Sequence, residues 1–105
     1  MSSLSCHILD TTNGLPAQDV VIHLQTLDGA RLESQTTNQD GRVSFSHPLE
    51  KDDYCLRFEV KPYCITHFKH AFFPFIDVNF TISDERHYHI PLLLSPFTFS
   101  SYRGS

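Results

Sequence analysis

Turn-forming residues recur along the chain at short intervals, and this spacing restricts the fold to one built from short strands. Asn13-Gly14, Asp28-Gly29 and Asp40-Gly41 are pairs that favour tight turns, and six prolines add further breaks. Between the breaks, apolar and polar residues alternate with the period of two of a half-buried strand. Such a series predicts an all-β sandwich or barrel.

About eight strands are expected, with one helical interruption. The run from Val20 to Leu27 is typical, because Val20, Ile22 and Leu24 share one face while the intervening residues share the other. The runs predicted as strands are 5–10, 20–27, 43–45, 54–60, 77–82, 87–95 and 98–102. Only residues 63–71 suit a short helix, which must end before Pro74.

The length and charge of the chain narrow its classes of partner. A chain of 105 residues predicts a single domain over residues 1–105. A domain of this size buries roughly 65% of its unfolded surface, so oligomerisation would help it to bury more. The formal net charge of −4 gives no support for binding nucleic acid or an anionic membrane.

Targeting signals are not recognisable, so a cytoplasmic location is expected, with a peroxisomal one left open. Residues 1–10 have neither the basic start nor the apolar run of a secretory signal. No stretch approaches the ~18 apolar residues of a membrane span. The final residues, Tyr102–Ser105, do not form a Ser-Lys-Leu peroxisomal signal. We expect Cys6, Cys55 and Cys64 to be reduced thiols, because their number is odd and their spacing is not that of metal ligands.

The seven histidines include a group suited to chemistry. His7 shares a strand face with Leu9, while His87 and His89 flank Tyr88 and therefore point the same way. A His-x-His pair can bind zinc or copper, with His7 as a third ligand. The spacing does not fix that third ligand, so we expect no metal and no cofactor.

Arg42 and the end of the chain are two further candidates. Arg42 follows the Asp40-Gly41 turn, where it is either solvated or presents its guanidinium to an anion or a polarised carbonyl. A strand that runs almost to the last residue predicts a docked tail. The chain has no Gly-x-Ser-x-Gly motif, so a covalent serine intermediate is not indicated.

Three blocks of sequence resemble the 5-hydroxyisourate hydrolases, the enzyme branch of the transthyretin-related proteins. The blocks are His7–Asp10 with 13–17, Thr37–Arg42, and His87–Pro96 continuing to Tyr102–Ser105. The terminal tetrapeptide is the most specific, since it separates the hydrolases from the thyroid-hormone carriers of the same fold. Residues 97–101 depart from the family's tyrosine-glycine-tyrosine-serine-threonine run.

The resemblance implies a fold, an assembly and a reaction. The fold would be a sandwich of two four-stranded sheets with one short helix, assembled as a homotetramer with active sites in the groove between dimers. The reaction would open the ring of 5-hydroxyisourate to 2-oxo-4-hydroxy-4-carboxy-5-ureidoimidazoline. His7 and His89 would activate water and protonate the leaving nitrogen, in an order left open. Arg42 would stabilise charge on the attacked carbonyl, and Tyr102, Arg103 and Ser105 would bind substrate.

Strand alternation agrees with one shared groove. His7 and Leu9 share one face of their strand. In the 87–95 run, the residues that share a face with His89 are Pro91 and Leu93, and in the tail Ser100, Tyr102 and Gly104 share a face. If the three faces line one groove, imidazoles, a phenol and apolar walls meet there.

Two other functions remain open. A carrier of a small aromatic ligand would use the same groove, but its walls would be apolar, whereas His7, Arg42 and His89 are polar. An immunoglobulin-like interaction domain without chemistry would tolerate removal of the last four residues.

Overall fold

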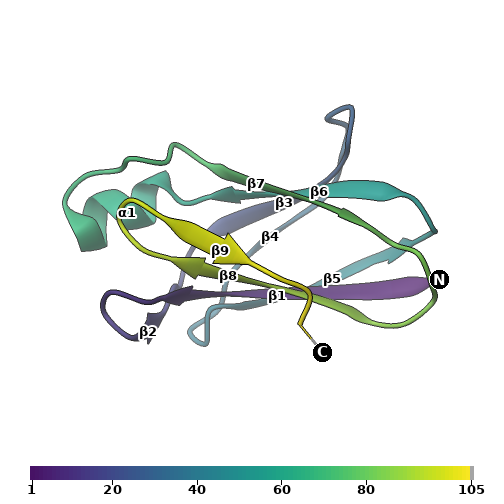
Figure 1. Cartoon of the computed structure of the whole chain (residues 1–105), viewed down its shortest axis with the longest axis horizontal. Coiled ribbons are helices and arrows are strands. Elements are labelled where there is room, and N and C mark those ends of the chain that lie inside the picture. Colours follow the sequence, from purple (N-terminus) through teal and green to yellow (C-terminus); the bar gives the residue numbers. More distant parts are fainter. Residues whose placement is uncertain (105) are drawn as a thin grey trace.

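A computed structural model describes residues 1–104 of the chain, which form nine strands and one helix (Figure 1). The elements are β1 (Ser2–Asp10), β2 (Leu15–Pro16), β3 (Val21–Thr26), β4 (Arg31–Thr36), β5 (Arg42–Leu49), β6 (Asp53–Glu59), α1 (Lys61–Phe68), β7 (Ile76–Thr81), β8 (Tyr88–Leu94) and β9 (Phe99–Ser101). The prediction of an all-β fold with one short helix is confirmed.

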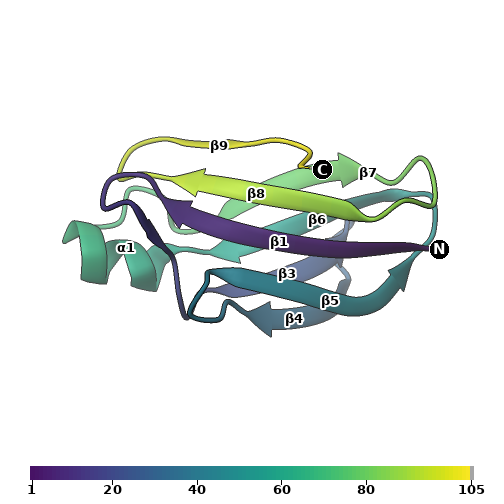
Figure 2. The same cartoon turned by 90° about the horizontal axis from the view of Figure 1, so that it is seen from below.

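The strands form two sheets that face each other. The β1 sheet has the order β2-β1-β8-β9, with β5 also paired to β1, and the β3 sheet has the order β4-β3-β6-β7. The family resemblance implies four strands in each sheet; the fifth strand of the β1 sheet is the two-residue β2, which pairs with the end of β1. Figure 2 shows β9, β8, β1 and β5 side by side.

The pairing of β1 with β8 is the one that positions the candidate site. These two strands run parallel, with Leu4 aligned to Tyr88 and Asp10 to Leu94, whereas the other pairings are antiparallel. A parallel pair needs a crossover connection, and here most of the chain forms it. Residues near the two ends of the sequence therefore lie side by side at the middle of one sheet.

Alternation in β1 and β8 separates a core face from an outer face. Cys6 and Ile8 of β1 are fully buried, while His7 and Leu9, which alternate with them along the strand, are half-buried. Burying a Leu, Ile or Phe side chain contributes about 1.5–3 kcal/mol, so this face fixes the register of the strand. The largest fully buried side chains are Phe58, Leu4, Ile8, Ile22, Leu24, Leu49, Leu56, Ile82, Leu92, Leu94, Val20 and Val60.

The three cysteines are free and buried. Burial raises the pKa of Cys6 to about 12, and burial, with the nearby charge of Asp77, raises the pKa of Cys55 to about 11. Because the thiolate is the reactive form, these side chains pack as small apolar groups.

The helix begins and ends earlier than the sequence predicts. It spans Lys61–Phe68 instead of residues 63–71, because Pro62 fits the first turn, where a helix needs no N–H from that position. Lys69 adopts a left-handed conformation with φ of 71°, which ends the helix. Within residues 1–104, no helix is long and apolar enough to cross a membrane.

Two edge strands frame an open groove on one side of the sandwich. β7 is the edge of the β3 sheet and β9 is the edge of the β1 sheet. Together with the C-terminal segment they line a cavity of about 320 Å³. Phe97 and Phe99 lie beside this edge and are exposed, and Phe99 contacts Phe73 edge to face at 5.3 Å between ring centroids.

Candidate functional site

His7 and His89 meet on the outer face of the β1 sheet. The register aligns Ser5 with His89 and His7 with Pro91, so the two imidazoles are diagonal neighbours on paired strands. His7 Nδ1 lies 2.8 Å from His89 Nε2, and the rings stack with centroids 5.0 Å apart. One nitrogen must donate and the other accept, so this contact holds one proton between the two rings.

The imidazole pair continues into a longer chain of hydrogen bonds. His89 Nδ1 lies 2.7 Å from Ser5 Oγ, and Ser5 Oγ lies 2.8 Å from His87 Nε2. His87 Nδ1 in turn lies 2.6 Å from Ser3 Oγ. We call these five residues (His7, His89, Ser5, His87 and Ser3) the histidine row. Every ring nitrogen of His87 and His89 is used within it.

The surroundings of the pair favour its neutral form. Partial burial lowers the pKa of His7, and the charge of Arg42 lowers it further. Burial is also the largest cause of the lowered pKa of His89, followed by the charges of His7, Arg42 and His87. Both values move down from about 6.5, so at neutral pH the imidazoles retain a lone pair that can accept a proton.

Arg42 lies next to His7 across the β1–β5 pairing. The two residues are direct partners in the register of these antiparallel strands, so their side chains share the outer face. Gly41, with φ of 71°, makes the turn that starts β5 at this point, and an added Cβ there would lie 2.7 Å from the Ile8 carbonyl oxygen. None of the ion pairs within residues 1–104 involves Arg42.

The C-terminal segment is docked beside His89. The Gly104 N–H donates to the His89 carbonyl at 2.7 Å, and an added Cβ at Gly104 would lie 2.9 Å from His89 Cδ2. The ladder between β8 and this segment is interrupted at Pro91, which has no N–H to donate. The tail that the sequence predicts to be docked is therefore docked at His89.

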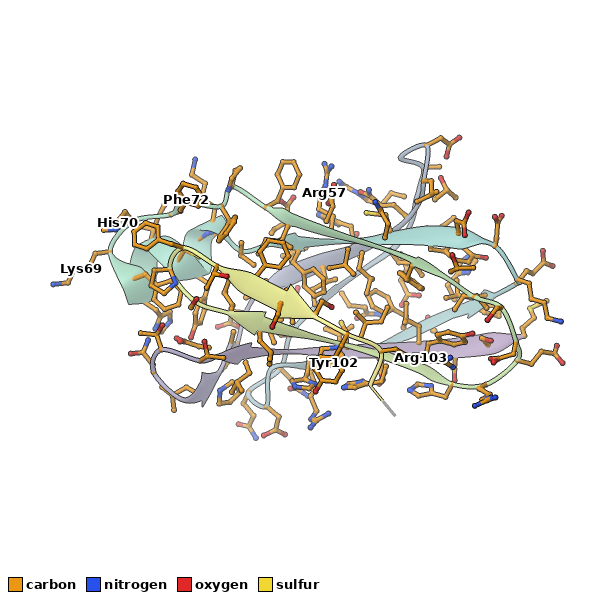
Figure 3. The ribbon with its side chains drawn as sticks, viewed as in Figure 1. Arg57, Lys69, His70, Phe72, Tyr102 and Arg103 are labelled. Carbon is orange, nitrogen blue, oxygen red and sulfur yellow. The ribbon has the colours of Figure 1, made fainter. Side chains whose placement is uncertain are left out.

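Tyr102 and Arg103 face opposite ways. The register that pairs His89 with Gly104 places Tyr102 opposite Pro91, on the face of the histidines. The Arg103 guanidinium instead lies 4.0 Å over the Tyr88 ring, with one nitrogen 3.8 Å from Asp84 Oδ1. Figure 3 labels both residues where the chain leaves β9. The structure does not bring Arg103 to the histidine face, and Ser105 lies outside the described residues.

Asp10 fixes the end of the strand that carries His7. Its carboxylate accepts hydrogen bonds from the Thr12 and Asn13 backbone, from the Asn13 side chain at 2.7 Å and from the Tyr63 hydroxyl at 2.7 Å. Burial alone would raise the pKa of Asp10, but these hydrogen bonds outweigh it and the pKa lies below its ordinary value. The turn after β1 is thus tied to α1 through a buried carboxylate.

The structure groups most of the predicted residues and adds others. His7, His89 and Arg42 come together, and Tyr102 joins their face. Sequence reasoning missed Ser3 and Ser5 and left His87 out of the site. The signal was present, since Ser3, Ser5 and His7 alternate on one strand. Within residues 1–104, no three His, Cys, Asp or Glu side chains are grouped to hold a metal ion.

Comparisons with known proteins agree with one another. The family model described as HIUase/Transthyretin family matches residues 4–104. The 5-hydroxyisourate hydrolase of Mus musculus is 36% identical over 113 residues, covering 99% of this chain and 96% of the mouse protein. The structure of Klebsiella pneumoniae 5-hydroxyisourate hydrolase superposes with a TM-score of 0.90 at 36% identity, over 100% of both chains. Sea bream transthyretin in complex with thyroxine superposes with a TM-score of 0.85 at 27% identity, over 96% of this chain and 93% of that one.

Proposed function

Since this chain belongs to the HIUase/transthyretin family, we propose that it is a 5-hydroxyisourate hydrolase, which opens the ring of its substrate with water. The observation that carries the proposal is the contact between His7 Nδ1 and His89 Nε2 beside Arg42. This arrangement offers a base, an acid and a fixed positive charge on one surface, which are the three elements that hydrolysis of a cyclic amide needs.

We assign His7 as the base that takes a proton from the attacking water. Both ring nitrogens of His89 are occupied, by His7 and by Ser5, whereas His7 Nε2 makes no hydrogen bond within residues 1–104. A water bound at His7 Nε2 gives up a proton as its oxygen attacks the ring carbonyl carbon. His89 holds the opposite nitrogen of His7 and fixes the orientation of its ring.

Arg42 stabilises the charge that develops during this attack. As the carbonyl becomes tetrahedral, its oxygen gains negative charge, and a guanidinium on the same face lies close enough in register to pair with it. Together with partial burial, which is the larger cause, the same positive charge lowers the pKa of both imidazoles. When the tetrahedral intermediate collapses, the amide nitrogen leaves with a proton delivered from the imidazole pair.

The C-terminal residues complete the binding site in this proposal. Tyr102 stands on the histidine face and can donate its phenolic hydrogen to an oxygen-rich heterocycle. Arg103 contributes indirectly, since its contacts with Tyr88 and Asp84 hold the tail in place. We assign Ser105 to hydrogen bonding with substrate on the family resemblance of the terminal tetrapeptide.

The alternative function is a carrier of an aromatic ligand, and the similarity to sea bream transthyretin in complex with thyroxine is the observation that favours it. The polarity of the face argues against it. An apolar aromatic ligand would have to cover two imidazoles and a guanidinium, and burying such groups without partners costs free energy. A polar substrate pairs with them instead.

Assembly as a homotetramer is proposed as well. The exposed edges of β7 and β9, with the exposed Phe97 and Phe99 beside them, are suited to pairing with a second copy. Two such dimers facing each other through the histidine face would close the site from bulk water. A mass of four chains in analytical ultracentrifugation would agree with this assembly, and a monomer at micromolar concentration would contradict it.

The function is tested by following the ultraviolet absorbance of 5-hydroxyisourate, generated in place from urate by urate oxidase. Decay should accelerate in proportion to added protein. The variant His89→Ala should lose this effect by about 10²-fold or more. The variant His47→Ala should retain it, because within residues 1–104 the His47 ring hydrogen-bonds only to the Pro48 carbonyl. Decay at the spontaneous rate with wild-type protein would contradict the proposed function, and thyroxine binding should then be measured.

A further inference from the structure

The histidine row extends well beyond the two imidazoles that the reaction requires. Its four contacts are between 2.6 and 2.8 Å, and His89 and His87 each bind two neighbours through different ring nitrogens, while His7 ends the row. Ser5 also has two partners, and its single hydroxyl can donate to only one while it accepts from the other. The five groups are thus connected in a line without a gap.

The environment changes along this line. His7, Ser5 and His89 are half-buried, whereas His87 and Ser3 at the far end are exposed. The row therefore leads from the catalytic nitrogen to solvent along the surface of the β1 sheet. We propose that it carries protons between His7 and solvent, with Ser5 and His87 as the positioning residues that complete the path. The proposal rests on the hydrolase function proposed above.

The row has two proton arrangements, and each keeps every group neutral. In the first, His7 Nδ1–H donates to His89, His89 Nδ1–H to Ser5, the Ser5 hydroxyl to His87, and His87 Nδ1–H to Ser3. His7 Nε2 then carries a lone pair and acts as a base. In the second, every donor and acceptor is exchanged, and His7 Nε2–H acts as an acid.

One proton transfer at each contact converts the first arrangement into the second. The attacking water transfers a proton to His7 Nε2, each group passes its own proton to the next, and Ser3 releases its hydroxyl proton to solvent. No group retains a charge, and one proton has been exchanged between substrate water and solvent. In the reverse direction, His7 gives its Nε2 proton to the leaving amide nitrogen, and each group of the row receives a proton from the next. Ser3 at the far end is reprotonated by solvent. His7 can thus serve as base and then as acid.

Other charged groups near the row do not interrupt it. Arg42, on β5, is the cation that faces His7 and His89. At the solvent end, Glu85 pairs with the amino terminus at 3.1 Å, and Arg86 pairs with Asp84 at 3.4 Å. No acid among residues 1–104 hydrogen-bonds to an imidazole of the row.

The test compares variants that break the row with variants that preserve it. Ser5→Ala removes the central hydroxyl and should lower kcat by about tenfold with KM nearly unchanged, whereas Ser5→Thr keeps a hydroxyl and should keep activity. His87→Gln can still hydrogen-bond to both serines but cannot pass a proton on, so it should lower kcat as Ser5→Ala does. Ser44→Ala is the matched control, because Ser44 lies directly opposite Ser5 on β5 and is exposed.

Imidazole added to the assay distinguishes two causes of a lowered kcat, the loss of proton transfer and the loss of the orientation of the His89 ring. A diffusible base can replace the missing path, so millimolar imidazole should restore kcat of His87→Gln and Ser5→Ala and leave wild type unchanged. Wild-type kcat in both variants would overturn the relay and leave the hydrolase function standing. The relay would also be overturned if Ser5→Ala loses kcat that imidazole does not restore while His87→Gln keeps full activity. If wild-type protein does not accelerate decay, the hydrolase proposal itself fails.

Discussion

His7 Nδ1 lies 2.8 Å from His89 Nε2 across a separation of 82 residues in the sequence. Each of these side chains occupies the outer face of its strand, and the parallel register of β1 and β8 brings them into contact. The pair therefore titrates and acts as a unit, and its pKa values belong to both rings.

The two histidines should behave as one catalytic unit. We expect His7→Ala and His89→Ala each to lower kcat/KM by about 10²–10⁴-fold, and the double variant to be no worse than the poorer single variant. Progress curves of 5-hydroxyisourate decay for the four proteins measure this. Additive losses in the double variant would show that the histidines act independently.

The value of kcat/KM should fall at acidic pH, and this fall should occur below the ordinary pKa range of histidine. Because the pKa values of His7 and His89 are lowered, the pair is neutral near pH 7, and kcat/KM should be flat there and fall only with an apparent pKa below about 6.5. A pH–rate profile from pH 4.5 to 8 measures it. An apparent pKa above 7 would contradict the proposed role of neutral imidazole.

Stability should respond to the same groups. Below pH 6.5 the unfolded chain binds protons at these histidines before the folded chain does, so the free energy of unfolding falls as pH drops through this window. Above pH 6.5 their contribution is fully present. Urea unfolding of wild type and His89→Gln at pH 5.5 and 7.5 isolates this effect, since the variant should lose less stability on acidification.

Removing the charge of Arg42 should raise the pKa of both imidazoles. Arg42 lowers both values, so Arg42→Gln should move the NMR titration of His7 and His89 ring protons to higher pH. The same variant should lower kcat by about 10²-fold or more through loss of carbonyl stabilisation. Arg31→Gln, on the edge strand β4, is the control and should change neither measurement.

Gly104 should tolerate no side chain. A Cβ there would lie 2.9 Å from His89 Cδ2 and 3.1 Å from the His89 carbonyl oxygen. We expect Gly104→Ala to displace either the tail or the imidazole and to lower kcat/KM by about tenfold or more. Thr98→Ala, at an exposed position just before β9, should leave kcat/KM unchanged.

The Tyr63 hydroxyl should contribute to stability but not to chemistry. Tyr63→Phe removes the 2.7 Å hydrogen bond to Asp10 and should lower the free energy of unfolding by about 1–3 kcal/mol, with kcat within about twofold of wild type. Urea denaturation measures the first value and the absorbance assay the second. A large loss of kcat would link Asp10 to the placement of His7.

Sequence predicted the strands wherever alternation was strong. The run from Val20 to Leu27 contains β3, and 87–95 contains β8, because apolar residues recur at every second position of each run. In the structure both faces of β3 are buried from Ile22 to Gln25, which the alternation does not predict. The strand β4 was not identified, since RLESQT contains a single apolar residue and lies at a sheet edge. Its pairing with β3 forms the strand despite its composition.

The candidate site was predictable in part for the same reason. Alternation and the family resemblance together indicated His7, His89 and Arg42. The row through Ser5 to Ser3 could not be derived, because it depends on the register between β1 and β8, which no local pattern reports. The orientation of Arg103 likewise depends on where the tail rejoins β8.

The parallel pairing of β1 with β8 also sets when the protein becomes active during its synthesis. His7 on β1 is made before β2 to β7 and α1, and its partner strand β8 follows only after these elements have emerged. A nascent chain that lacks β8 has only one histidine of the pair, and one side of β1 has no partner strand. Because the contact between β1 and β8 is non-local, that side stays exposed until late in folding. Under the proposed mechanism, a translation fragment that ends before His89 should not catalyse the reaction, so the onset of activity would report that β8 has joined β1.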